Sequence, residues 1–124
     1  MYRLRINPVA KQDLSDIKEY ITKELDNPIA AINVVSTIIE SYKKLKDYPK
    51  LGLELSSKVK VNTDYRYLIS GNYLVFYKIE GNYISIYRIL HARRDYVKLL
   101  FKEVQKQEEY WRSGGTDTLL RFMQ

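Results

Sequence analysis

The dipeptide Asn-Pro occurs twice near the start of this chain, at Asn7-Pro8 and Asn27-Pro28, and each copy precedes residues with helical spacing. An asparagine side chain can accept hydrogen bonds from free N–H groups at a helix start, and proline at the first helical position has no N–H to lose. The apolar stripe of the first segment consists of Ala10, Leu14, Ile17, Ile21 and Leu25. The stripe of the second consists of Ile32, Val35, Ile39, Tyr42 and Leu45, widened by Val34 and Ile38. Because only a short link around Asp26 separates the two, we predict an antiparallel helical hairpin.

Residues 2–6 alternate between polar and apolar side chains, which predicts a short strand before the hairpin. Three further strands are predicted near 58–67, with an extension to Ile69 left open, and at 73–79 and 83–91, because turn residues separate these runs. From Asp95 the spacing becomes helical again. The predicted fold class is α+β: an N-terminal strand, an antiparallel helical hairpin packed on an antiparallel β-sheet, and a C-terminal helix. We expect residues 1–100 to form one domain and residues 101–124 a helical extension or tail.

Strict alternation assigns the side chains of the last two strands to two faces, provided that both turns are tight two-residue turns. The more apolar face, expected under the helices, carries Tyr73, Val75, Tyr77, Ile79, Ile84, Ile86, Arg88 and Leu90. The polar and aromatic face, expected to be open, carries Leu74, Phe76, Lys78, Tyr83, Ser85, Tyr87, Ile89 and His91. A three-residue loop in either turn would reverse this assignment.

Composition narrows the class of protein and the chemistry of its partners. With 124 residues, 45% of them hydrophobic and 29% charged, the chain is expected to be a single globular domain. Its apolar runs are shorter than the roughly 18 residues that span a bilayer, and the absence of cysteine fits a cytoplasmic protein. One histidine and no cysteine make a zinc site implausible. The net charge of +6 favours a polyanionic partner, either a nucleic acid or an acidic protein.

The only histidine lies at the end of the last predicted strand, directly before a basic run. His91 could act as a general acid or base, because the pKa of imidazole is close to neutral, or it could cap the strand end. The basic run could bind phosphates or an acidic peptide, and it consists of Arg93, Arg94, Lys98 and Lys102. Its alternative interpretation is a solvated surface on which one of the two arginines pairs with Asp95.

Arg66 is unusual because the charge of an arginine inside a strand must be paired or reach solvent. It could bind a ligand, or it could form a structural ion pair with an acid of the hairpin, with Asp13, Asp16 and Glu19 as candidates. Seven of the 12 tyrosines lie between residues 65 and 96. Tyrosine can stack on bases but is also a common strand residue, so we expect most of the seven to pack in the sheet.

In order and spacing, these segments resemble the RelE/ParE superfamily of toxins from type II toxin–antitoxin systems. The resemblance covers about residues 2–100 and rests on Asn7-Pro8-Val9-Ala10 with Asp13-Leu14 and Ile17, Asn27-Pro28-Ile29-Ala30-Ala31, Leu45 with Tyr48-Pro49-Lys50-Leu51-Gly52, Tyr65-Arg66, Tyr73-Leu74-Val75-Phe76-Tyr77, and Ile89-Leu90-His91-Ala92-Arg93-Arg94-Asp95. It implies a toxin that arrests growth when free of a cognate antitoxin, whose acidic and largely disordered segment would fold on binding. It implies no cofactor.

The resemblance leaves two classes of target. RelE-like members cut messenger RNA in the ribosome, and for that activity the catalytic candidates are His91, Arg93, Arg66 and Tyr96. Leu74 stands where such toxins often carry a second catalytic arginine. The long hairpin and the link at residues 48–52 are more similar to the ParE branch, whose studied members inhibit DNA gyrase without intrinsic catalysis. We therefore expect a ParE-like toxin, with a RelE-like messenger-RNA endoribonuclease as the alternative.

The residues expected to contact the acidic antitoxin or the target are Arg93, Arg94, Lys98, Tyr87 and Lys78. The segment from Lys102 to Gln124 extends beyond the usual end of the family, and disorder is one interpretation of it. Its apolar residues could dock in a groove or mediate a homodimer, and they are Leu119, Leu120, Phe122 and Met123. A toxin–antitoxin heterotetramer is the other assembly to consider.

Overall fold

The computed structural model of the protein describes residues 2–101. Its helices are α1 (Pro8–Lys23), α2 (Pro28–Lys43) and α3 (Leu55–Val59), with a 3-10 turn, η1, at Lys44–Lys46. The strands are β1 (Arg3–Ile6), β2 (Leu53–Glu54), β3 (Arg66–Ser70), β4 (Tyr73–Glu80) and β5 (Tyr83–His91). They form one sheet in the order β1-β5-β4-β3-β2, in which β1 and β5 are parallel and the other neighbours are antiparallel. Residues 96–101 begin a further helix, and the rest of the predicted C-terminal helix and the tail lie outside the described residues.

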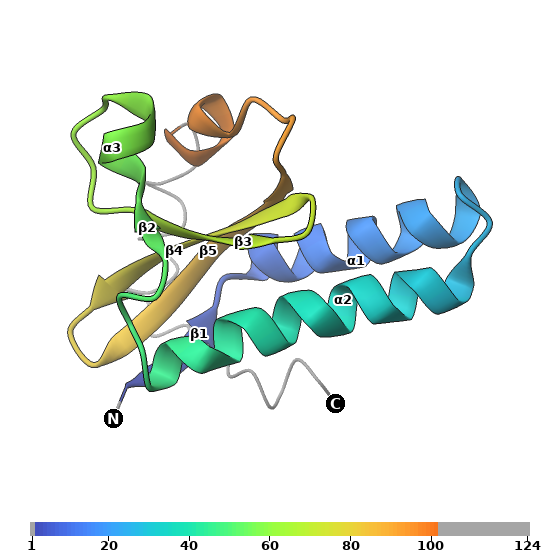
Figure 1. The fold of residues 1–124 in the computed structure, drawn as a ribbon, viewed down its shortest axis with the longest axis horizontal. Coiled ribbons are helices and arrows are strands. Elements are labelled where there is room, and N and C mark those ends of the chain that lie inside the picture. Colours follow the sequence, from blue (N-terminus) through green and yellow to red (C-terminus); the bar gives the residue numbers. More distant parts are fainter. Residues whose placement is uncertain (1, 102–124) are drawn as a thin grey trace.

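The predicted helical hairpin is confirmed, and both Asn-Pro pairs begin a helix. Asn7 Oδ1 accepts a hydrogen bond from the N–H of Val9 at 2.8 Å, and Asn27 Oδ1 accepts one from a helical N–H at 3.0 Å. Figure 1 shows α1 and α2 side by side, with their joined end extending past the sheet. Leu25, in the loop that joins the two helices, and Ile32, near the start of α2, are exposed. Among the described residues, no helix is long and apolar enough to cross a membrane.

A β-bulge between β4 and β5 changes the predicted faces of the second half of β5. The pairing shifts between Phe76 and Tyr77 and skips Tyr87, so β5 contains one extra residue at this point. Beyond the bulge, Ile89 packs in the core under the helices, whereas Leu90 packs in the core on the opposite face. Strict alternation placed Leu90 under the helices and Ile89 on the opposite face. This prediction was wrong because the bulge reverses the alternation. Both turns are tight, and the core under the helices contains Val75, Tyr77, Ile84 and Ile86 as predicted.

The face of the sheet that was predicted to be open is covered. A second core forms there from α3, the sheet and the beginning of the last helix, and its buried members are Leu55, Tyr65, Tyr67, Leu74, Phe76, Tyr87, Leu90 and Leu100. The rings of Tyr65 and Tyr87 meet edge to face, with 5.4 Å between their centroids. The prediction of an open face was therefore wrong, because α3 and residues 96–101 supply apolar side chains that bury this surface.

Residues 58–65 are not a strand, contrary to the prediction. Helix α3 ends here, where Lys60 adopts a left-handed conformation with φ of 56°, and β3 begins only at Arg66. Lysine and valine alternate from residue 58 to residue 61, which imitates a strand in the sequence. The apolar pair that decides the structure is Leu55 and Val59, four residues apart on one helical face, and both pack against the second core.

Candidate functional site

The corner at residues 91–96, predicted to carry the chemistry, forms a compact turn at the end of β5. The backbone N–H of Arg93 donates to Nδ1 of His91 at 3.1 Å, and the N–H of Arg94 donates to the carbonyl oxygen of His91 at 2.9 Å. The His91 ring also meets the Tyr73 ring edge to face, with 5.4 Å between their centroids. One imidazole nitrogen therefore closes the turn, which leaves Nε2 as the atom for contact with a partner or substrate.

Three basic side chains of this corner are exposed, namely Arg93, Arg94 and Lys98. Within residues 2–101 none of them forms an ion pair, and the Asp95 carboxylate instead accepts the backbone N–H of Lys98 at 3.4 Å. Tyr96 is different, because its ring packs against Phe76 with 5.2 Å between centroids and so joins the second core. The corner thus presents positive charge to solvent, while its tyrosine has a packing role.

A groove of about 700 Å³ lies beside this corner, between the helical hairpin and the ends of β4 and β5. The hairpin side of the groove is mostly apolar, with two acids of α1, Asp13 and Asp16, at one part of it; its other lining residues are Ile17, Tyr20, Ile21, Leu25, Ala30 and Val34. Tyr73, His91 and Arg94 line the sheet side. Tyr20 and Leu25 are 54% and 58% exposed, although both side chains are large and mostly apolar. An apolar groove with a basic edge suits an amphipathic helix that carries acidic residues.

Asp13, which also lines the groove, is held in a buried ion pair. Its carboxylate accepts hydrogen bonds from Nε and Nη2 of Arg88, at 2.9 Å each, and from the N–H of Ile89 at 2.8 Å. Burial raises the pKa of Asp13, and the hydrogen bonds from Arg88 and Ile89 oppose that rise. The pairing of β1 with β5 ends at Ile86. Beyond this point a longer β1 would have covered the edge of β5, and the Asp13 carboxylate accepts the N–H of Ile89 there instead. The pair fixes α1 to β5 three residues before His91.

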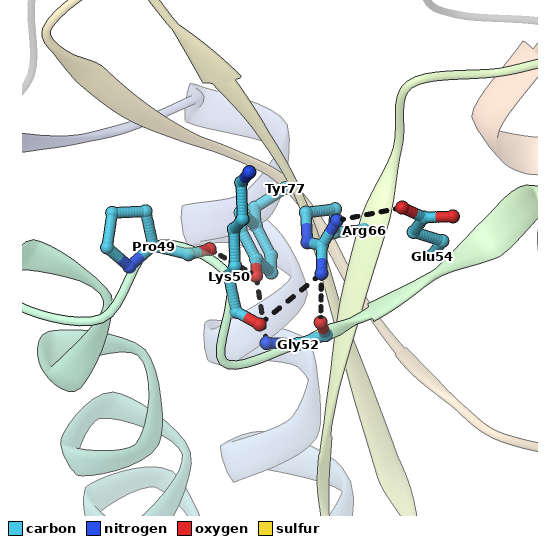
Figure 2. A network of polar contacts seen from close by, with 6 residues as sticks. All are labelled: Pro49, Lys50, Gly52, Glu54, Arg66 and Tyr77. Atoms are coloured by element: carbon cyan, nitrogen blue, oxygen red, sulfur yellow. Dashed lines mark hydrogen bonds and ion pairs between the residues drawn. The ribbon is translucent and has the colours of Figure 1, made fainter.

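Arg66 belongs to a separate network at the other edge of the sheet, which Figure 2 shows. Its Nη2 donates to the carbonyl oxygens of Gly52 at 2.7 Å and Lys50 at 3.3 Å, and its Nη1 lies 3.5 Å from a carboxylate oxygen of Glu54. Arg66 therefore has a structural ion pair, but the expected partner on the hairpin was wrong. Asp13 pairs with a different strand arginine, and the acid that Arg66 meets lies on β2.

Tyr77 completes this network beneath the link between α2 and β2. Its hydroxyl group donates to the carbonyl oxygen of Pro49 at 2.7 Å and accepts the N–H of Gly52 at 3.0 Å (Figure 2). A Cβ atom at Gly52 would lie 2.7 Å from the carbonyl oxygen of Tyr67 and from the Tyr77 ring, so only glycine fits there. The network holds the link at residues 49–54 in one conformation.

Lys78 and Tyr87, expected to contact a partner, are buried, with 8% and 0% of their surfaces exposed. The Nζ atom of Lys78 lies 3.3 Å from the Asp64 carboxylate and 4.6 Å from the centroid of the Tyr65 ring. The Tyr87 hydroxyl donates to Glu80 at 2.8 Å. The structure therefore does not bring these two residues together with the exposed basic corner, and their contact with a partner stays a prediction.

Sequence reasoning missed the Asp13–Arg88 pair and the part of the groove formed by Tyr20 and Leu25. Two signals in the sequence point to the pair, since Asp13 directly precedes Leu14 on an apolar stripe and Arg88 stands within an otherwise apolar strand. The groove has no comparable local signal, because it depends on how far the hairpin extends past the sheet.

Comparisons with known proteins identify the family. The family model of the ParE toxin of the type II toxin–antitoxin system parDE matches residues 4–96, from β1 to the basic corner. A chain of the solved chromosomal ParDE toxin–antitoxin system from P. aeruginosa is 26% identical with a TM-score of 0.63, and the match covers 73% of this chain and 96% of that chain. The comparison with curated proteins gives no match. The chain therefore belongs to the ParE toxin family within the RelE/ParE superfamily, the toxins of type II toxin–antitoxin systems.

Proposed function

We propose that this toxin arrests growth, when free of its antitoxin, by inhibiting DNA gyrase through binding and without catalysis of its own. Membership of the ParE family supports the toxin assignment. The choice of target rests on one observation, which is the dispersal of the groups that a RelE-like nuclease needs, because Arg66 lies apart from the corner that holds His91, Arg93 and Tyr96. Inhibition by binding needs an exposed surface, whereas RNA cleavage needs several groups around one phosphate.

The dispersal follows from the register of the strands. His91 lies opposite Tyr73, which lies opposite Ser70 of β3, so one rung of the sheet contains all three. Arg66 precedes Ser70 by four residues, which corresponds to roughly 13 Å along the strand. Its guanidinium is also engaged by two carbonyl oxygens. Leu74, at the position where the nuclease branch often has an arginine, is buried. These placements favour the gyrase proposal over the nuclease alternative.

The cognate antitoxin, in this proposal, binds the groove with an acidic segment that folds into an amphipathic helix on contact. Apolar residues of that helix would cover Tyr20 and Leu25, which the toxin leaves exposed. Acidic residues would meet the exposed charges of Arg93 and Arg94 at the corner. The solved relative comes from a ParDE toxin–antitoxin system, which supports a partner of this kind. The net charge of +6 would speed association with an acidic partner.

The test is expression of the chain without its antitoxin, followed by measurement of labelled precursor incorporation into DNA and protein. We expect DNA synthesis to stop first and a DNA-damage response to appear, while transcripts stay intact. A rapid stop in protein synthesis with cleaved transcripts would reject gyrase as the target and favour the RelE-like endoribonuclease. Arg93→Ala, a variant at the exposed corner, should leave transcripts intact as the wild type does.

A further inference from the structure

The sheet edge formed by β2 and β3 carries a second apolar surface, at the other end of α2 from the groove described above. Leu51, Leu53 and Ile69 are 50%, 55% and 62% exposed and line a depression of about 320 Å³ together with Ser41 and Lys44. A single exposed aliphatic residue is ordinary on a protein surface. Three around one depression form an apolar patch, which is typical of an interaction site.

The two leucines stand on a rigid support. The Tyr77 hydroxyl holds the carbonyl oxygen of Pro49 and the N–H of Gly52, and Arg66 holds the carbonyl oxygen of Gly52 (Figure 2). These hydrogen bonds, of which the one from Gly52 to Tyr77 is buried, lie on both sides of Leu51 and immediately before Leu53. The link therefore cannot easily rearrange to bury its leucines, and a surface fixed in advance loses little conformational entropy when a partner binds.

The same edge leaves a place for another strand. In an antiparallel ladder, alternate residues direct their N–H and C=O groups to the same neighbour. Tyr65 accepts the N–H of Leu55 on the β2 side, so Tyr67 and Ile69 also face that side. Strand β2 begins at Leu53, opposite Tyr67, and does not reach Ile69. The backbone groups of Ile69 therefore face an edge that no strand of residues 2–101 covers, and an added strand could pair with them.

The charges around the surface identify the kind of partner. Lys44 lines the depression, and the segment that leads into it contains Lys46 and Lys50 with one acid, Asp47, so positive charge predominates. A second copy of this chain would bring the same lysines together, which the net charge of +6 makes unfavourable. We propose that this edge binds an acidic, extended segment of another protein, which adds a strand beside Ile69 and inserts apolar side chains between Leu51 and Leu53. This surface is separate from the groove that we assign to the antitoxin helix.

The test uses the purified full-length chain, with labelled methyl and amide groups, and a short synthetic peptide that alternates valine and glutamate. Nuclear magnetic resonance should show shifts of the Leu51, Leu53 and Ile69 methyl groups and slower hydrogen exchange of the Ile69 amide. Ile69→Lys should weaken binding about tenfold or more. Ile29→Lys, which changes an isoleucine on α2 that is 73% exposed, should bind as the wild type does. Both variants should keep the amide spectrum of the folded chain.

Several outcomes would overturn the proposal. They include the absence of methyl shifts at millimolar peptide, equal binding of a peptide with lysine in place of glutamate, and shifts confined to the groove near Tyr20. Undiminished binding of a peptide whose backbone N–H groups are methylated would reject strand addition. A concentration-dependent dimer that Ile69→Lys abolishes would identify a second copy as the occupant. None of these results depends on whether gyrase is the target.

Discussion

Arg88 and Asp13 lie 75 positions apart in the sequence and form a bidentate ion pair, with both donor–acceptor distances at 2.9 Å. Both residues are buried. Removing one partner of such a pair is costly, whereas replacing both by uncharged residues of similar volume is often tolerated. The pair joins α1 to β5 beside the groove, so we regard it as the contact that sets the position of the hairpin relative to the basic corner.

Arg88→Met should lower the free energy of unfolding at pH 7 by about 3–5 kcal/mol, because it leaves the Asp13 carboxylate buried with the N–H of Ile89 as its remaining donor. Urea denaturation measures the change. Arg3→Met removes an exposed arginine and should cost less than about 0.5 kcal/mol.

The same variant should show a pH dependence with a defined sign. Burial raises the pKa of Asp13, and Arg88→Met removes the group that opposes the rise most. A carboxyl group with a raised pKa in the folded state contributes stability below its unfolded pKa, and that contribution is lost as pH rises through the folded pKa. The deficit of the variant should therefore shrink between pH 7 and pH 4. Adding Asp13→Asn should restore stability at pH 7, and failure to do so would contradict the assigned role of the pair.

Tyr77→Phe should lower the free energy of unfolding by about 1–3 kcal/mol, because it leaves the buried N–H of Gly52 without its acceptor. Tyr42→Phe is the matched control. Tyr42 is equally buried, but its hydroxyl makes no hydrogen bond within the described part of the chain. Its removal should leave stability unchanged or slightly increased. Equal losses in the two variants would show that the Tyr77 hydroxyl does not hold the link.

The ionisation of Tyr42 should also contribute to denaturation at alkaline pH. Burial raises the pKa of Tyr42 well above its ordinary value. In the unfolded chain this tyrosine ionises near pH 10, whereas in the folded chain it stays neutral. The free energy of unfolding therefore falls as pH rises above that value. The contribution is about 1.4 kcal/mol per pH unit. Tyr42→Phe should remove it, and unfolding curves at two alkaline pH values will show whether its slope is shallower than that of the wild type.

Tyr20→Glu should weaken antitoxin binding by at least about tenfold, because it places a charge in the apolar wall of the groove. Calorimetric titration of the toxin with its antitoxin measures the affinity, and growth assays should show a toxin that the antitoxin neutralises poorly. Tyr48→Glu changes an exposed tyrosine outside the groove and should bind the antitoxin normally. Equal affinity of both variants would place the antitoxin elsewhere.

The helical hairpin and the tight turns were predictable because their determinants are local. Asn7 and Asn27 act on N–H groups two and three residues away, and Gly71 and Gly81 adopt the positive φ angles of 58° and 61° at the two turns. The bulge at Tyr87 and the burial of the second face were not predictable in this way. They depend on contacts with residues distant in sequence, such as Leu55 and Leu100, that no local pattern reveals.

Part of the candidate site was likewise predictable from the sequence, and part of it depended on the fold. The corner was found from the sequence because His91, Arg93 and Arg94 are nearly contiguous. The partner of Arg66 could not be found, since several acids were within reach in the sequence and only the fold selects Glu54. The groove required the three-dimensional position of the hairpin, which brings Tyr20 beside strand ends that follow it by more than 50 residues.

The most direct test of the account is a supercoiling assay with purified DNA gyrase, relaxed plasmid and the purified full-length chain. We expect a dose-dependent loss of supercoiling that the antitoxin prevents, together with intact messenger RNA when the same protein is added to translating ribosomes. Unchanged supercoiling at a molar excess of the chain, with messenger RNA cut on the ribosomes, would contradict it.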